Sequence, residues 1–302
     1  MPEPKDILVV GSVNMDLVLE VEARPRPGET VLARRAELLP GGKGANQAVA
    51  ACRLGASVRF AGLVGNDAIG GALRRGLEAE GIATDALSTV ESVSGLAAIS
   101  LTPDGENAIT VAPGANGDLT PDRILALPED VFRCRVLVLQ LEIPVASAAA
   151  AARRGRAAGA QVILNPSPPD PGIGELLSLT DWLVLNRLEA QVLTGADDPA
   201  AAAALLLRRG PAAVFVTLGA QGVHVAAGTS GQTIPAPAVV PVDTTGAGDA
   251  FTGALAFALS RGEGPLAAAQ LAVRAGAAAT QAKGAQAAMP TQADLGRVAH
   301  TG

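Results

Sequence analysis

The stretch VLVLQLEIPVASAAAAARRGRAAGAQVIL, residues 136–164, shows how the chain is built. Two short apolar runs, Val136–Leu141 and Gln161–Leu164, enclose the alanine-rich segment Ala146–Ala158. Short apolar runs of this kind are typical of buried strands, and alanine is the strongest helix former. Residues 136–164 are therefore predicted to form a strand–helix–strand unit whose two strands lie parallel in one sheet.

The same alternation continues along the chain. Trp182–Leu185 and Ala213–Leu218 are predicted to be buried strands, and Arg187–Leu193 and Pro199–Arg209 are predicted to be helices. Alternation at this spacing predicts an α/β fold with a doubly wound, mainly parallel sheet that is covered by helices on both faces.

Shorter strands are predicted in the first half, at Asp16–Val21, Leu96–Leu101 and Ala108–Val111. They could form a small sheet apart from the main layer or an ordinary antiparallel edge of it. We expect a single domain over residues 1–302, with a small β-sheet lid formed by segments near residues 16–40 and 93–111.

Composition excludes several classes of protein. The 302 residues are 49% hydrophobic and 17% charged, as in a compact globular protein. The net charge is −6 and basic residues are scattered, so no nucleic-acid surface is expected. No apolar run reaches membrane-spanning length, and the polar N-terminus lacks signal-peptide features, so a cytoplasmic location is expected. Cys52 and Cys134 could form one disulfide, but free thiols fit that location.

The segment DTTGAGDAFTG, residues 243–253, is predicted to bind an anion. Its spaced glycines let backbone N–H groups converge, and Asp249 stands at the start of a predicted helix, Ala250–Ser260. The chain has no tyrosine and only two histidines, so general-base work falls mainly to Asp or Glu. Asp249 is therefore predicted to act as a base beside a phosphate site.

A second glycine-rich segment, GGKGAN at residues 41–46, precedes a predicted helix at Gln47–Arg53. Three glycines allow close approach of the backbone to a ligand, and Lys43 and Asn46 supply hydrogen-bond donors. The segment is not a P-loop, because Gly44 follows the lysine where Ser or Thr is required. Its alternative is a flexible turn that leads into the helix.

Polar side chains follow other predicted strands. Asn14 and Asp16 come soon after the strand Ile7–Val10, while Glu142 and Asn165 follow or close two later strands. Ligands of open α/β sheets bind beyond the carboxyl ends of the strands, so Asn14 and Asp16 are candidates for binding the hydroxyls of a polyol, and Glu142 is expected at the same edge. Asn14 and Asp16 could instead form an Asx turn.

Two further segments suit a nucleotide. Asn186 and Glu189 open a predicted helix, and they could hold triphosphate oxygens and hydrated Mg²⁺ or simply cap that helix. The glycine-punctuated segment Thr217–Gly222 could wrap a nucleotide or form a hairpin turn.

With these residues in hand, the chain resembles the ribokinase branch of the PfkB carbohydrate-kinase family. The likeness runs from about Ile7 to Pro290, and the segments at 41–48 and 243–249 correspond to the two family signatures. The resemblance implies a ribokinase-like α/β domain with a β-sheet lid, through which such enzymes commonly form homodimers. It implies ATP-dependent phosphorylation of D-ribose at O5, with Mg²⁺ and an activating K⁺.

The resemblance also assigns the sugar and the catalytic positions. Asp249 matches the base, and the backbone of Gly246, Ala247 and Gly248 matches the anion hole for the transferred phosphate. The positions that match sugar-binding residues are Asn14, Asp16, Gly42, Lys43, Gly44, Ala45, Asn46, Glu142 and Asp249.

Nucleotide and cation positions follow in the same way. Ala282 stands where arginine is frequent, and Ala288 stands where a small hydroxyl residue is usual, so water would replace one K⁺ ligand there. The ATP positions are Asn186, Glu189, Thr217, Leu218, Gly219, Ala220, Gln221, Gly222, Gly248 and Asp249, with Glu189 organising Mg²⁺; the K⁺ positions are Asp243, Thr245, Ala279, Ala282, Gly284 and Ala288.

Three other functions stay open. The first is another sugar or nucleoside kinase of the same family, for example one specific for 2-deoxyribose. The second is a sugar-binding regulator without catalysis, against which the intact segment 246–249 argues. The third is a nicotinamide-dependent oxidoreductase, which fits the alternation but lacks the glycine fingerprint after the first strand.

Overall fold

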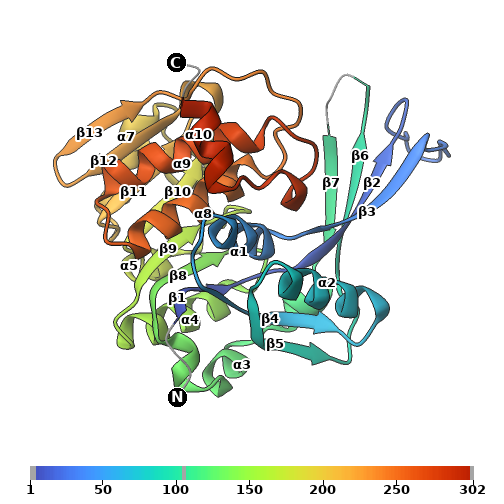
Figure 1. The fold of residues 1–302 in the computed structure, drawn as a ribbon, viewed down its shortest axis with the longest axis horizontal. Coiled ribbons are helices and arrows are strands. Elements are labelled where there is room, and N and C mark those ends of the chain that lie inside the picture. Colours follow the sequence, from blue (N-terminus) through green and yellow to red (C-terminus); the bar gives the residue numbers. More distant parts are fainter. Residues whose placement is uncertain (1–4, 104–106, 300–302) are drawn as a thin grey trace.

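The computed structural model describes residues 5–103 and 107–299, and its main feature is one large sheet with helices on both faces (Figure 1). The strands from β11 to β5 are parallel to their neighbours, while β12 and β13 add an antiparallel edge. The predicted doubly wound α/β fold is therefore confirmed. The nine strands lie in the order β13 (Ser230–Ile234), β12 (Val223–Ala227), β11 (Ala213–Thr217), β10 (Trp182–Asn186), β9 (Gln161–Asn165), β8 (Cys134–Gln140), β1 (Lys5–Val10), β4 (Val58–Gly65) and β5 (Ala83–Val90).

Alternate residues of the central strands supply two separate cores. In β1, Ile7 and Val9 enter one core, and Leu8 and Val10 enter the other, because successive side chains of a strand point to opposite faces. Helices α1 (Lys43–Arg53), α2 (Ala68–Ala79), α8 (Ala247–Ser260), α9 (Pro265–Ala279) and α10 (Gln292–Ala299) cover the face of Ile7 and Val9. Helices α3 (Pro121–Ala126), α4 (Val145–Ala157), α5 (Gly174–Ser178), α6 (Arg187–Thr194) and α7 (Pro199–Leu207) cover the other face. In the part of the chain that the structure describes, no helix has both the length and the apolar character needed to span a membrane.

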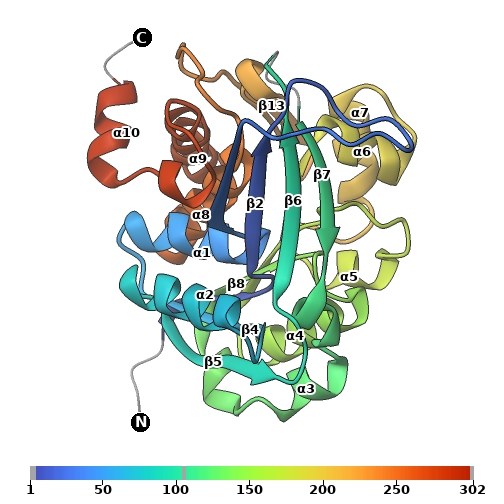
Figure 2. The same ribbon diagram turned by 90° about the vertical axis from the view of Figure 1, so that its right-hand side faces the viewer.

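A second, smaller sheet stands apart from the main layer (Figure 2). The strands expected in the first half belong to this sheet, which rules out the alternative of an ordinary edge of the main sheet. Residues 104–106, within the expected lid segment 93–111, lie outside the described residues. Its strand order is β3 (Arg35–Gly41), β2 (Asn14–Glu20), β6 (Gly95–Leu101) and β7 (Asn107–Ala112).

The glycine-rich segment at 41–46 is not a loop. Helix α1 begins at Lys43 rather than at the predicted Gln47, so the first turn of the helix contains Gly44 and Asn46. A Cβ on Gly44 would lie 2.8 Å from the backbone N and O of Ser12. The weak helix propensity of glycine was misleading here, because this glycine serves close packing between segments that are distant in sequence.

The start of the helix in the second glycine-rich segment was also predicted too late. Helix α8 begins at Ala247 rather than at the predicted Ala250, after Gly246 in a left-handed conformation with φ 78°. Asp249 therefore belongs to the first turn of α8, and its backbone position is set by that helix.

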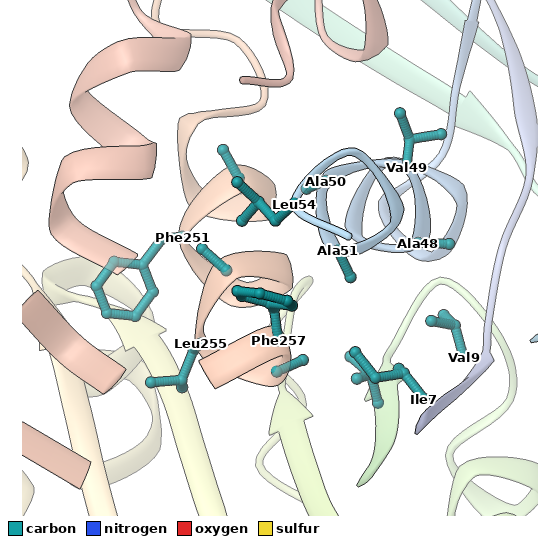
Figure 3. Close-up of a cluster of buried hydrophobic side chains, with 14 of the residues drawn as sticks. Ile7, Val9, Ala48, Val49, Ala50, Ala51, Leu54, Phe251, Leu255 and Phe257 are labelled. Atoms are coloured by element: carbon teal, nitrogen blue, oxygen red, sulfur yellow. The ribbon is translucent and has the colours of Figure 1, made fainter. Parts of the chain in front are cut away.

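Helices α1 and α8 pack closely because the residues between them are small. Figure 3 shows Ala50, Ala51 and Leu54 of α1 in the same buried cluster as Phe257 of α8. A Cβ on Gly253 of α8 would lie 2.6 Å from the Ala50 Cβ and also 2.6 Å from the backbone O of Gln47. The spacing of the two helices therefore depends on the absence of a side chain at position 253.

Replacing Gly253 with alanine is expected to destabilise the fold. Overpacking of this contact should lower the free energy of unfolding by about 1–3 kcal/mol, measured by urea denaturation. The matched control is Gly296→Ala in α10, where an added Cβ meets nothing within 4 Å. The control should leave stability unchanged or raise it by up to about 1 kcal/mol through helix propensity. Equal stabilities of the two variants would contradict the close α1–α8 contact.

Candidate functional site

Polar residues from several strands meet at one edge of the main sheet. β1, β8, β9, β10 and β11 are parallel neighbours, so their carboxyl ends lie together. Asn165 and Asn186 are the last residues of β9 and β10, and Glu142 comes two residues after β8. The predicted concentration of polar groups at this edge is present in the structure.

The N-terminus of α8 is built to receive an anion. Gly246 is its N-cap, and no side chain caps the helix. Gly248 is exposed, and a Cβ placed there would meet nothing within 4 Å. The Ala247 N–H donates to the Thr244 carbonyl oxygen over 3.2 Å. Open space at an uncapped helix N-terminus suits a phosphate group, through the backbone N–H groups and the helix dipole.

The Asp249 carboxylate is held by two side-chain amides from α1. Its Oδ2 accepts a hydrogen bond from Asn46 Nδ2, and its Oδ1 accepts one from Gln47 Nε2, each 2.9 Å long. Asp249 is only 6% exposed, and this burial raises its pKa more than Lys43 and the two amides lower it. A carboxylate with a raised pKa is suited to accept a proton from a substrate.

Lys43 lies among carboxylates. Burial by itself lowers the pKa of this ammonium, but Asp249, Glu142 and Glu189 together outweigh burial and raise it. Lys43 is therefore charged in the folded protein and links the acids of the sugar side with Glu189 of α6.

Glu142 joins the start of the small sheet to α1. Its Oε2 accepts from Ser12 Oγ over 2.5 Å, from the Lys43 backbone N over 3.0 Å and from Asn14 Nδ2 over 3.4 Å. The other end of the Asn14 amide is fixed as well, since its Oδ1 accepts from Asn116 Nδ2 over 2.7 Å. Asn14 is therefore held with its amino group towards Glu142.

Asp16 of β2 faces the same acids. Its pKa is raised to about 7 by burial first, and then by the charges of Glu142 and Asp249. A Cβ on Gly41 would lie 2.1 Å from Asp16 Oδ2, so the carboxyl group rests directly against the Gly41 backbone and a side chain at position 41 would displace it. Near neutral pH this group is present both as acid and as carboxylate, and can donate to or accept from a hydroxyl.

The structure thus brings together most of the predicted sugar-binding residues. Gly42 is the N-cap of α1 with φ 89°, close to the backbone of Val13 and Asn14. Gly44 and Ala45 are buried, and the Ala45 N–H donates to the Ser12 carbonyl. These two residues pack the helix against segment 11–12.

Asn186 and Glu189 form a capping box at the start of α6. The Asn186 N–H donates to Glu189 Oε2 over 2.8 Å, and the Glu189 N–H donates to Asn186 Oδ1 over 2.9 Å. The capping alternative is therefore correct for the ligand-free chain. Glu189 is 8% exposed and raises the pKa of Lys43, so it lies as a buried acid beside the cluster of Lys43, Asp249 and Glu142.

The segment Thr217–Gly222 connects the antiparallel strands β11 and β12, as the hairpin alternative predicts. Gly219 and Gly222 have positive φ angles, and Gln221 Oε1 accepts from Arg187 Nη2 over 2.9 Å. The hairpin follows β11 at the same sheet edge as Asn186, so both segments could contact one nucleotide.

The predicted cation positions gather beside the N-terminus of α8. Asp243 Oδ1 accepts from the Thr245 N–H over 2.9 Å, and Asp243 Oδ2 accepts from the Gly284 N–H over 2.8 Å. Ala279 ends α9, and Ala288 is buried in the 3₁₀ turn Gln286–Ala288. Within residues 5–103 and 107–299, no group of three or more His, Cys, Asp or Glu is arranged to hold a metal. A monovalent cation here would depend on backbone carbonyls, which these loop residues can supply.

A cavity of about 540 Å³ opens between the small sheet and this loop. Asp16, Val18 and Glu37 line it from the small sheet, and Asp243 and Lys283 line it from the loop. Through Asp16 it reaches the acids that are predicted to bind the sugar.

Sequence reasoning assigned no role to Ser12, Gln47 or Asn116, which hold Glu142, Asp249 and Asn14 respectively. The sequence feature that could have indicated these residues is a polar side chain among small or apolar neighbours, as for Gln47, which follows Asn46 and precedes the apolar residues 48–51. The two cysteines, Cys52 and Cys134, are free.

Comparison with known proteins identifies relatives of the whole chain. The model of the family described as "pfkB family carbohydrate kinase" matches residues 4–292. A ribokinase of Bacillus subtilis (strain 168) is 41% identical over 292 residues, which cover 96% of this chain and 98% of that protein. A deoxyribokinase of Salmonella typhi is 36% identical over 296 residues, covering 95% of this chain and 96% of that protein.

Two solved structures share the fold. The ribokinase from Thermotoga maritima superposes with a TM-score of 0.90 at 34% identity, covering 98% of this chain and 99% of that chain. The Arabidopsis thaliana ribokinase, complexed with ribose and ATP, gives a TM-score of 0.89 at 32% identity, covering 99% of this chain and all (100%) of that chain. The resemblance stated from the two glycine-rich segments is confirmed.

The raised pKa of Asp16 predicts a pH-dependent stability of the ligand-free protein. Its pKa is about 7 in the folded state and about 4 when unfolded, so the folded state binds more protons between these values. Proton binding by Asp16 therefore stabilises the folded state. This contribution to the free energy of unfolding is complete below about pH 4 and is lost as the pH rises through 7. The free energy of unfolding of Asp16→Asn, relative to the parent, should therefore increase from about pH 5 to about pH 8.

Urea denaturation at both pH values tests this difference. The control Asp122→Asn, at an exposed position of α3, should differ from the parent by the same amount at both pH values. If Asp16→Asn behaves like this control, Asp16 has an ordinary pKa.

Proposed function

Because the chain belongs to the pfkB family of carbohydrate kinases, we propose that it transfers the γ-phosphoryl group of ATP to O5 of D-ribose, giving D-ribose 5-phosphate and ADP. One observation carries the proposal most directly. The buried Asp249 carboxylate lies in the first turn of α8, beside an uncapped N-terminus, and faces a cluster of polyol-binding side chains. The proposed base, anion site and sugar-binding side chains thus lie next to one another.

The sugar is held by groups that suit neutral hydroxyls. Carboxylates at Asp16 and Glu142 accept hydrogen bonds, while Lys43, Asn46 and Asn14 can donate them. Asn46 Oδ1 is buried and has no partner among the described residues, so it is available to a substrate hydroxyl. The backbone of Gly42 completes this grip.

Asp249 takes the proton from the O5 hydroxyl as that oxygen attacks the γ-phosphorus. The uncapped first turn of α8 at Gly246, Ala247 and Gly248 holds the charge on the transferred phosphoryl group through its free backbone N–H groups and the helix dipole, and the leaving oxygen departs with ADP. The small sheet acts as a lid that excludes water, which limits hydrolysis of ATP.

The nucleotide occupies the side of α6 and the β11–β12 hairpin. Asn186, Glu189 and the Thr217–Gly222 segment contact ATP, and Glu189 organises hydrated Mg²⁺. When bound, Mg²⁺ neutralises triphosphate charge and orients its oxygens. The buried carboxylate of Glu189 fits that donor chemistry, because carboxylate oxygens are ligands that Mg²⁺ prefers.

A monovalent cation, K⁺, is the proposed activator. Asp243, Thr245, Ala279, Ala282, Gly284 and Ala288 surround its position, mostly through backbone carbonyls, so alanine at 282 and 288 is tolerated. Its charge would support the anion site, because Asp243 is bonded to the segment that leads into α8.

The assembly and location form the last part of the proposal. The lid face turned away from Asp16 carries Leu17, Leu19 and the exposed Leu38, and it suits a homodimer formed through the lid. A cytoplasmic location fits two free thiols and an ATP substrate.

A 2-deoxyribose kinase is the alternative, since the Salmonella typhi relative that bears the name deoxyribokinase is nearly as similar as the ribokinases. The two sugars differ only at the 2-hydroxyl. ADP release with ribose, 2-deoxyribose and other sugars, each with and without K⁺, decides between them. Ribose should give the highest kcat/KM and K⁺ should raise it. A higher kcat/KM with 2-deoxyribose would establish the alternative, and sugar binding without ADP release would indicate a regulator.

Replacing the base should affect chemistry more than binding. Asp249→Asn is expected to lower kcat by roughly 10²–10⁴-fold, the usual contribution of a general base. Asp122→Asn, the exposed acid of α3, serves as the control and should keep the parent rate. Near-parental kcat in Asp249→Asn, in steady-state assays of ADP release, would reject Asp249 as the base.

A further inference from the structure

A chain of buried amides stands behind Asp249 on the side of the main sheet. Gln47 Nε2 donates to Asp249 Oδ1 over 2.9 Å and to Asn165 Oδ1 over 3.0 Å. Gln47 Oε1 accepts from Gln140 Nε2 over 2.6 Å. Gln47 and Gln140 are 1% and 0% exposed, so neither amide can exchange these partners for water.

The orientation of every amide in this chain is determined by Asp249. A carboxylate can only accept, so the Gln47 amino group has to face it, and the Gln47 carbonyl then faces Gln140. Gln140 must in turn present its amino group. Its own Oε1 is left buried with no partner among the described residues.

That unpartnered oxygen is informative. A buried carbonyl without a hydrogen bond costs free energy, and two glutamines kept only for packing could be replaced by apolar residues without that cost. A Cβ on Gly11 would lie 2.0 Å from Gln140 Oε1, so the backbone beside β1 also leaves room for this amide. The arrangement fits a function at the carboxylate rather than packing alone.

The two oxygens of Asp249 have different surroundings. Oδ1 is occupied by Gln47, whose other contacts are in the core, whereas Oδ2 lies beside Asn46, a residue of the proposed sugar site. With Oδ1 fixed, the carboxyl group cannot rotate freely about its Cβ–Cγ bond. Oδ2 is then the oxygen presented to the substrate.

We propose that Gln47, backed by Gln140 and Asn165, is a positioning residue that fixes the catalytic base in one orientation and directs its Oδ2 to the sugar hydroxyl. This inference rests on the proposed role of Asp249. The two N–H donors from Gln47 and Asn46 also favour the charged form of Asp249 against burial. The other charged groups that face Asp249 are Lys43 of α1, Glu142 after β8 and Asp16 of β2, and none of them is altered by changing Gln47.

The test is Gln47→Met, which keeps a similar volume and removes the donor. We expect kcat to fall by about 10- to 100-fold, the range for loss of one hydrogen bond to a charged group, with KM for the sugar changed less than about 3-fold. Loss of the donor raises the pKa of Asp249. The acidic limb of kcat against pH, measured at saturating sugar, should therefore move to higher pH by about one unit.

The matched control is Gln161→Met, at an exposed glutamine that begins β9, on the opposite edge of the sheet. It should leave kcat and the pH profile unchanged. A folded Gln47→Met enzyme with parental kcat and an unmoved acidic limb would overturn the proposal, as would a rise in KM that accounts for the whole loss.

If Gln47→Met does not fold, Gln140→Met decides the question. It removes the donor that orients Gln47 and leaves the Gln47–Asp249 pair itself in place. A smaller fall in kcat with a shift of the acidic limb in the same direction supports the proposal, and an unchanged profile overturns it. Failure of the proposed function is recognised separately, because Asp249→Asn would then keep its kcat.

Discussion

The close approach of α1 and α8 is the contact on which the site depends. Gly253 has no side chain, so the backbone of Gln47 and the Cβ of Ala50 can lie against α8. One turn before Gly253, Asp249 then comes within hydrogen-bond distance of Asn46 and Gln47. Asp249, the proposed base, is thus placed by helix packing, and a pair of packed helices holds it more accurately than a loop would.

The same contact concentrates charge. Lys43 lies in a cluster with Asp249, Glu142 and Glu189, and Asp16 faces two of these acids. More acids than ammonium groups surround the proposed sugar position, so an acceptor that is already phosphorylated would be repelled, whereas a neutral polyol can use the carboxylates as hydrogen-bond acceptors. The proposed site for anionic charge is instead the N-terminus of α8.

Sequence predicted the layers well and the site less completely. Buried strands and alanine-rich helices have local patterns, and so do the capping box of Asn186 and the hairpin after β11. The start of α1 was predicted wrongly because the need for Gly44 comes from Ser12, a residue 32 positions away. Asn116 bonds Val13 and Asn14 across 103 and 102 positions. The residue pattern within one segment cannot indicate a contact with a segment so distant in sequence. Only the folded topology brings the two segments together.

The base of the small sheet is fixed to the main body, and this decides which residues of the proposed sugar site are held in place. Asn116 bonds both the N–H and the carbonyl of Val13, and it also holds Asn14. Beside it, a Cβ on Gly95 would lie 2.2 Å from both amides, so β6 approaches closely at the same point. Asn14 pairs with Gly95 at the start of both strands, while Asp16 lies two residues further out. A movement of the outer part of the small sheet would therefore leave Asn14 with Glu142 and change the position of Asp16. Asp16 is therefore the residue of the proposed sugar site whose position depends on the outer part of the small sheet.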